Sequence, residues 1–230
     1  MTANQVIATL HQSANPLAVA GMARFGSRPA HALGVSIPVL RKMAEALGKN
    51  HSLALELWAS GLHEARILAS MIDDPRLVSE HQMEAWVNDF DSWDVCDQVC
   101  GNLFDKTPYA FQKAVEWCHC EPEFVRRAGF VMMAELAVHD KLASDEAFLP
   151  FFPLIKQYAT DERNFVKKAV NWALRQIGKR NAILRVSALE WAEQIRAMDS
   201  KTAQWIAKDA MKELLAHEVK ENTQDERLSS

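Results

Sequence analysis

Two runs of this 230-residue chain place a tryptophan beside charged side chains at helical spacing. In the first run, Trp93 and Asp97 are four residues apart, so they are neighbours on one face of a helix. The apolar stripe of that helix consists of Val95, Val99 and Leu103. At about 100° per residue, Asp97 points roughly 160° away from this stripe. A carboxylate on that face can stabilise a developing positive charge. A tryptophan there either contacts a ligand or is covered by a neighbouring helix.

The second run belongs to an expected helix that begins at Asn164. Its apolar stripe contains Val166, Ala169, Val170, Ala173 and Ile177. The opposite face carries three cations, Lys168, Arg175 and Lys179, with Trp172 among them and no acidic residue in the set. Cations beside an aromatic ring suit an anionic backbone and a stacking surface, and this phase predicts a largely exposed tryptophan. A solvated basic face is the alternative interpretation.

Arg127 lies in a segment that is apolar nearly all round, as expected for a central, buried helix. The apolar residues are Phe124, Val125, Phe130, Val131, Met132, Met133, Leu136 and Val138. A buried guanidinium requires a carboxylate or a phosphate as its partner. The sequence therefore leaves two roles open, a structural salt bridge and a contact with a nucleic-acid phosphate.

The cysteines do not indicate a metal site. Cys96 and Cys100 are four residues apart on a helix, and Cys118-His119-Cys120 follows, a spacing that matches no zinc finger or zinc ribbon. Small buried hydrophobic roles suit them better. The sequence also lacks a glycine-rich phosphate loop, an HExxH motif and a nucleophile elbow. We therefore expect neither a metal nor a cofactor.

Composition excludes a disordered or fibrous chain, because 49% of the residues are apolar, 24% are charged, and there are only 8 Gly and 8 Pro. The net charge of -4 hides a segregation: the net charge is +4 over residues 1–50, -10 over 51–125, +5 over 126–185 and -3 over 186–230. Four cysteines are too few for a disulfide scaffold, which favours a reducing cytoplasm. The first residues lack the basic start and apolar run of a signal peptide, and no run approaches the about 20 apolar residues of a membrane span.

The elements that must position these residues are helices, about twelve of them. Ser36-Ile37-Pro38 opens one that stops before Gly48, with proline in the first turn and glycine as the C-terminal cap. Asp74-Pro75, Lys106-Thr107-Pro108 and Glu121-Pro122 separate later helices. Because no Gly/Ser linker divides the chain, we predict a single helical domain over residues 1–217, followed by a polar and frayed tail over residues 218–230.

An internal repeat indicates how the helices stack. Arg126-Arg127-Ala128, Lys167-Lys168-Ala169 and Lys208-Asp209-Ala210 follow one another at intervals of 41 residues, each near the start of an expected long helix. A helix-pair period near 40 is typical of HEAT and armadillo repeats. The predicted fold is therefore an all-α, HEAT-like solenoid of antiparallel helix pairs with a concave binding face. An ordinary all-α bundle with coincidental spacing is the alternative.

Four segments resemble, in order and context, the signature segments of the AlkD-type DNA alkylation repair glycosylases. They are residues 33–42 (LGVSIPVLRK), 91–97 (DSWDVCD), 124–128 (FVRRA) and 168–175 (KAVNWALR). The similarity runs from about residue 20 to 215, which covers most of the chain. The resemblance implies a HEAT-like fold that binds double-stranded DNA carrying alkylated bases, with no membrane partner. It suits a monomer in the cytoplasm, associated with the nucleoid through DNA.

The resemblance also implies an activity, the excision of purines alkylated at N3 or N7 by cleavage of the N-glycosidic bond. Asp97 matches the family's catalytic carboxylate. Trp93 and Trp172 match aromatics that flank the sugar of the damaged nucleotide, and Arg127 matches an arginine that holds a backbone phosphate. The lesion is expected to stay outside any base pocket and to be recognised through backbone and shape.

One position departs from the family pattern. Where the family often has a tyrosine, nine residues before the glycine of the early helix, this chain has Phe25. The aromatic ring can still stack, but the hydroxyl hydrogen bond is lost, which bears on the rate and the lesion preference. The other hypothesis is a helical-repeat module that binds DNA or protein through its concave face without chemistry.

Overall fold

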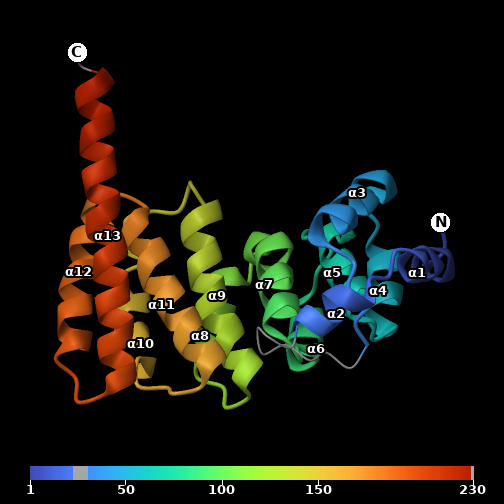
Figure 1. Cartoon of the computed structure of the whole chain (residues 1–230), viewed down its shortest axis with the longest axis horizontal. Helices are drawn as coiled ribbons and strands as arrows, with labels where there is room; N and C mark the ends of the chain where they lie inside the picture. The colour runs from blue at the N-terminus through green and yellow to red at the C-terminus, as the bar shows by residue number, and fades with distance from the viewer. Residues whose placement is uncertain (23–30, 229–230) are drawn as a thin grey trace. The chain divides into compact units, whose positions relative to one another are not determined.

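The computed structural model describes residues 1–22 and 31–228, with side chains described up to residue 218. These residues form thirteen α-helices and two short 3-10 helices, and no β-strand occurs among them (Figure 1). The all-α prediction is therefore confirmed. None of the helices in the described ranges has the length and apolar character needed to cross a membrane.

The chain divides into two compact units, which we call unit 1 (Met1–Tyr109) and unit 2 (Ala110–Ser230). The division follows directly after the Lys106-Thr107-Pro108 break. A single repeat domain over residues 1–217 therefore stays a prediction.

Unit 1 is organised around one buried helix, α5. Its helices are α1 (Ala3–Gln12), α2 (Pro16–Met22), α3 (Ile37–Leu47), α4 (His51–Ala59), α5 (His63–Ile72), α6 (Glu80–Asn88) and α7 (Trp93–Asn102), followed by the 3-10 helix η2 (Phe104–Lys106). Helix α5 packs against α1, α3, α4 and α7. It is therefore the element that can link α7 to the N-terminal part of the unit.

The limits of α3 agree with the sequence prediction. Ser36 is the N-cap residue, proline lies in the first turn, and Gly48 caps the C-terminus with φ +67°. The Gly48 N–H donates to the Ala44 carbonyl at 2.9 Å. Glycine is favoured there because a side chain disfavours a positive φ.

An aromatic stack fills the part of unit 1 that includes α4 and α6. The rings of Trp58 and Trp86 lie parallel with their centroids 3.9 Å apart, and Phe90 and Phe104 extend the cluster. The Trp58 indole N–H donates to Asp89 at 2.9 Å, which satisfies its one polar group.

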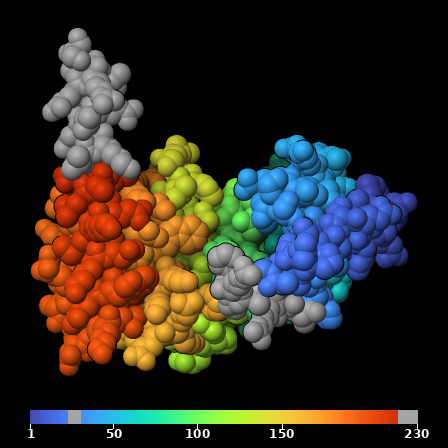
Figure 2. All heavy atoms as spheres, in the orientation of Figure 1, coloured from blue at the N-terminus to red at the C-terminus, as the bar shows by residue number. Residues whose placement is uncertain are grey.

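Unit 2 is a stack of three helix pairs. Its helices are α8 (Ala110–Cys118), α9 (Glu123–His139), α10 (Phe151–Tyr158), α11 (Asn164–Lys179), α12 (Ala182–Arg196) and α13 (Lys201–Leu228), with a 3-10 helix, η3 (Asp145–Ala147), before α10. Among the second helices of the pairs, α11 packs against both α9 and α13. Figure 2 shows them side by side on the surface of unit 2, from yellow-green to red. Helix α13 continues to Leu228, so residues 218–228 of the expected tail have a helical backbone.

The 41-residue repeat corresponds to this stack. Ala128, Ala169 and Ala210 are all fully buried, in α9, α11 and α13 respectively. The repeated motif starts at the fourth residue of α9 and of α11 but at the eighth residue of α13, one turn later than expected. The repeat therefore identifies equivalent packing positions, while the last helix begins earlier than its two predecessors.

A glycine fixes the contact within the first pair. A Cβ atom at Gly129 of α9 would lie 2.4 Å from the Cys118 backbone nitrogen of α8, far inside van der Waals contact. Only a residue without a side chain allows the two backbones to approach this closely.

Candidate functional site

Helix α7 presents the two residues that the resemblance implicates in chemistry. Val95 and Val99 are fully buried, whereas Trp93 and Asp97 both keep part of their surface exposed. The helical phase therefore assigned the core and non-core faces of α7 correctly. Because Trp93 and Asp97 are one turn apart, a group bound at this face can contact both.

The other acidic residue of α7, Asp94, is held by a buried histidine. His63 Nε2 lies 3.0 Å from Asp94 Oδ2, and the two side chains are 3% and 19% exposed. Burial works to lower the pKa of His63, but the hydrogen bond and charge of Asp94 outweigh it and raise that pKa above 6.5. Burial likewise works to raise the pKa of Asp94, and the contact with His63 lowers it below 3.8. This pair ties the first turn of α7 to the first turn of α5.

The residue after His63 ties the same turn of α5 to the segment before α3. The Glu64 carboxylate, 2% exposed, accepts the backbone N–H groups of Leu33 at 2.9 Å and Gly34 at 2.6 Å. Gly34 has φ +77°, and a Cβ atom there would lie 2.3 Å from the Asn15 carbonyl oxygen. Two adjacent α5 residues therefore fix both α7 and the approach to α3.

His63 and Glu64 are not among the predicted site residues, although the sequence carries a signal for them. His63 lies four residues before Ile67, and Glu64 lies four before Leu68, so each shares the face of a buried aliphatic residue. A polar residue on the apolar face of a helix requires a partner. The identity of the partners, about 30 residues away along the chain, is not visible in that pattern.

Phe25, the aromatic residue at the position where the family often has tyrosine, lies outside the residues that the structure describes. Its stacking role therefore stays a prediction.

Unit 2 carries the second set of predicted site residues, on α11. Lys168 is exposed, and no acidic partner lies within ion-pair distance of it among the described residues. Trp172 is only partly exposed, so the expectation of a largely exposed ring is wrong. The helical phase locates the apolar stripe of α11 but carries no information about its neighbours. Because α11 packs against α9, α12 and α13, residues outside the stripe can also be covered.

The other two cations of this face are paired with the neighbouring helix. Arg175 and Lys179 both contact the Glu213 carboxylate of α13, and Asp209 lies 4.0 Å from Arg175. The sequence set contained no acidic residue because these partners lie more than thirty residues further along the chain. Roles for Arg175 and Lys179 in DNA binding stay predictions, with their charges partly compensated by α13.

Arg127 is buried, as its apolar surroundings indicate, and is 6% exposed. Its Nη1 donates to the Phe165 carbonyl at the start of α11, at 2.6 Å. This contact connects the N-terminal part of α9 to the first turn of α11. A phosphate-binding role for Arg127 stays a prediction.

The preceding residue forms the salt bridge that a buried arginine needs. Arg126 donates to Asp161 at 2.9 Å and to Glu121 at 3.1 Å, and its guanidinium lies 4.7 Å from the centroid of the Tyr158 ring. Burial works to raise the pKa of Asp161, but hydrogen bonds from Arg163 and Arg126 hold it at about 2. The carboxylate is therefore ionised, and this cluster is structural.

The cysteines have the hydrophobic role that the sequence suggested. Cys96, Cys100 and Cys118 are buried in the core, while Cys120 is partly exposed. Burial raises the pKa of the Cys118 thiol to about 12, which keeps it protonated. Because the thiolate is the metal-binding and nucleophilic form, Cys118 suits packing rather than chemistry.

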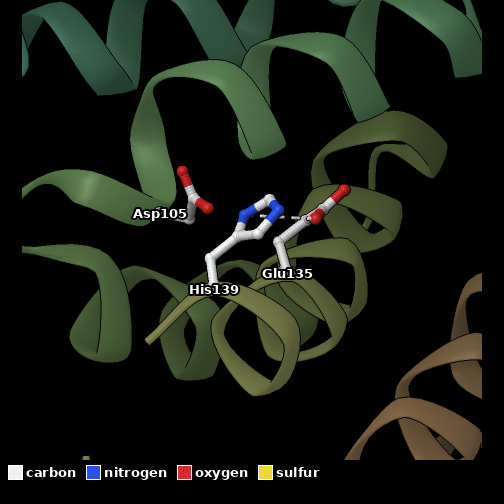
Figure 3. A group of neighbouring side chains, drawn as sticks. All are labelled: Asp105, Glu135 and His139. Carbon is white, nitrogen blue, oxygen red and sulfur yellow. Dashed lines mark ion pairs between the residues drawn. The ribbon is translucent and has the colours of Figure 1, made fainter. Parts of the chain in front are cut away.

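A histidine and a glutamate contact each other near the C-terminal end of α9. His139 Nδ1 lies 3.5 Å from Glu135 Oε2, one turn earlier (Figure 3). Side chains one turn apart on a helix are neighbours, so this contact acts locally within α9.

Comparisons with known proteins agree on the fold class and the family. The family described as DNA alkylation repair enzyme matches residues 6–214. A solved structure is similar over 92% of this chain and 95% of its own, with a TM-score of 0.75 and 19% sequence identity. It is described as a member of a new family of proteins related to the HEAT-like repeat DNA glycosylases with affinity for branched DNA structures. No curated protein matches significantly. The HEAT-like fold prediction is thereby confirmed.

Proposed function

Because this chain belongs to the DNA alkylation repair enzyme family, we propose that it hydrolyses the N-glycosidic bond of purines alkylated at N3 or N7 in duplex DNA. The observation that carries this proposal is that Trp93 and Asp97 lie one turn apart on the same, partly exposed face of α7. A carboxylate beside an aromatic ring can stabilise the positive charge that develops in this reaction.

The chemistry needs little from the protein beyond a positioned negative charge. An N3- or N7-alkylated purine is already cationic, so it can leave without a general acid. The sugar passes through an oxocarbenium-like state, which the Asp97 carboxylate would stabilise while orienting a water molecule. The Trp93 ring face adds cation–π support for the same charge. No metal or cofactor is required.

In unit 2, we assign backbone contacts to the α11 face that carries Lys168 and Trp172. The exposed ammonium suits a phosphate, and the partly exposed ring suits a sugar or a base. Arg127 would reach a phosphate only by giving up or sharing its contact with the Phe165 carbonyl. Phosphate binding by Arg127 therefore requires a rearrangement of an existing hydrogen bond.

A second candidate function is binding of branched DNA without excision. The similar solved structure, which matches this chain over 92% of its length, is described as having affinity for branched DNA structures. In this case the exposed cations would recognise the shape of the nucleic acid, and Asp97 would have no chemical role.

One experiment separates the two candidates. Base release is measured from a duplex containing 7-methylguanine, with wild type and Asp97→Asn in parallel, and binding to a four-way junction is measured with the same preparations. Lesion-dependent release that requires Asp97 supports the glycosylase. Tight junction binding without any release, unchanged in Asp97→Asn, supports the binding module and overturns the glycosylase.

A further inference from the structure

Unit 1 contains a cavity of about 280 Å³, lined by residues of α2, α5, α7 and the segment leading into α3. Its apolar wall includes Ala18, Met22, Ile37 and Ile67. Small-molecule sites in proteins are concave, mostly apolar and span about 300–1,000 Å³. The cavity therefore has the character of such a site, with a volume just below this range, which limits it to a small ligand.

Two buried polar atoms belong to the side chains that line this cavity. Trp93 Nε1 and His63 Nδ1 both lack a hydrogen-bond partner among the described residues. His63 is only 4% exposed, so solvent reaches it poorly. Leaving a buried polar group unsatisfied is unfavourable, and such groups are rare in folded proteins. Two of them at one cavity indicate a ligand that hydrogen-bonds to both.

The chemistry of the wall specifies what that ligand carries. The indole N–H of Trp93 can only donate, so the ligand must offer an acceptor. Nδ1 of His63 donates or accepts according to the protonation of the ring. The Gln98 amide at the same cavity can also do either. A ligand with ring nitrogens and an amino group satisfies such a set.

The carboxylates of the wall are already engaged, which disfavours a cationic ligand. Glu64 accepts backbone N–H groups from Leu33 and Gly34, and Asp94 is paired with His63. Protein donors therefore already occupy oxygens of both carboxylates, which leaves a cation less opportunity for direct pairing at this wall. A neutral, planar ligand suits this environment better than a cation.

We propose that this cavity binds the neutral alkylated purine base after its release. This inference rests on the proposed function. Hydrolysis adds the hydroxyl of water to the sugar C1′, the electron pair of the C1′–N bond passes to the base, and the remaining proton of the water goes to solvent. The cationic purine thereby becomes a neutral heteroaromatic base. Trp93, which belongs to both the catalytic face of α7 and the cavity, connects the two.

The test uses free 3-methyladenine and the full chain without DNA. Wild type should bind the base saturably in isothermal titration calorimetry. Ala18→Phe, which fills the cavity from α2, should weaken binding at least about tenfold. Leu17→Phe is the matched control, because Leu17 is the preceding residue, is 85% exposed and does not line the cavity. Binding that is equal in Ala18→Phe and wild type would overturn the proposal.

A second measurement does not depend on how Ala18→Phe folds. In ¹⁵N-labelled protein, the indole N–H resonance of Trp93, assigned with Trp93→Phe, should shift on addition of 3-methyladenine. An unshifted resonance at saturation would show that the base binds elsewhere. Excision with no binding of the free base would overturn the cavity assignment alone. Binding of the free base without excision would support the cavity and overturn the proposed glycosylase.

Discussion

Helices α7 and α11 each carry a tryptophan among charged residues on the face away from their apolar stripe. The two faces differ in which of their charged residues pair with neighbouring helices. On α7, a buried histidine 31 residues earlier pairs with Asp94, and Asp97 remains partly exposed. On α11, Glu213 pairs with both Arg175 and Lys179, and Lys168 remains exposed. In each helix, a partner from another helix compensates some of the charges.

The difference lies in what the compensation achieves. The His63–Asp94 pair joins a buried histidine to a partly buried carboxylate and connects two first turns, so it fixes the position of α7. The contacts with Glu213 are at a partly exposed edge and reduce the positive charge of a surface. A charge pattern on one helix therefore shows where charges lie, whereas the neighbouring helices determine which of them act on a ligand.

The largest expected effect concerns Asp97. Asp97→Asn keeps the shape of the side chain but removes the charge that we propose stabilises the developing oxocarbenium ion, so base release should fall by about 10²–10³-fold. Single-turnover release from 7-methylguanine duplexes measures this. The exposed Asp91→Asn is the matched control and should retain full activity. A fully active Asp97→Asn protein would remove Asp97 from the mechanism.

The second prediction tests the buried pair of unit 1. His63→Leu leaves the partly buried Asp94 without its partner, which should reduce the free energy of unfolding by about 1–3 kcal/mol, less than for a fully buried pair. Chemical denaturation at pH 5.5 measures the loss. His81→Leu, at an exposed position of α6, should change stability little. Equal stability of the His63→Leu protein and wild type would show that the pair does not fix α7.

The same pair predicts a pH dependence of stability. The raised pKa of His63 means that its contribution is complete below pH 6.5 and is lost as the pH rises through the raised value. The lowered pKa of Asp94 means that its contribution is complete above pH 3.8 and is lost as the pH falls through the lowered value. The stability difference between wild type and Asp94→Asn should therefore be largest between pH 3.8 and 6.5. A difference that grows above pH 8 would contradict this assignment.

Trp172 tests the corresponding face of α11. Because the ring is partly buried, Trp172→Ala should cost about 1–3 kcal/mol of stability, between the values for surface and core positions. Separately, loss of a nucleotide contact should weaken the free energy of DNA binding by about 1–3 kcal/mol. Thermal melts and duplex titrations on one preparation measure both. Trp205→Ala, at a ring that is 43% exposed on α13, is the control for stability. Unchanged DNA affinity per folded molecule would make Trp172 a packing residue.

The smallest expected effect separates the cations of α11. Lys168→Gln should reduce the slope of log affinity against log salt by about one unit, as for one lost phosphate contact. Lys179→Gln should reduce it less, because Glu213 already compensates that charge. Glu213→Gln should raise duplex affinity for the same reason. Equal slopes for the two lysine variants would contradict this expectation. They would show that Lys179 leaves Glu213 and contacts a phosphate when DNA binds.

The sequence by itself determined the local structure of this protein and the direction of its side chains. The limits of α3 followed from Pro38 and Gly48, because their backbone preferences act within one turn. The core face of α7 followed from Val95 and Val99, because the helical repeat is constant. The 41-residue repeat located Ala128 and Ala169 at equivalent positions, because stacked helix pairs repeat their packing. All of these signals are short in range or periodic.

Only the tertiary structure decided which charges are compensated and how far each aromatic ring is covered. The pairing of His63 with Asp94, the contacts of Glu213 with Arg175 and Lys179, and the partial burial of Trp172 all depend on helices that are distant in sequence. Periodicity within one helix specifies its own faces but carries no information about the side chains of the helix that packs against it. Electrostatic compensation and burial are properties of that contact, so they were determined only when the helices packed together.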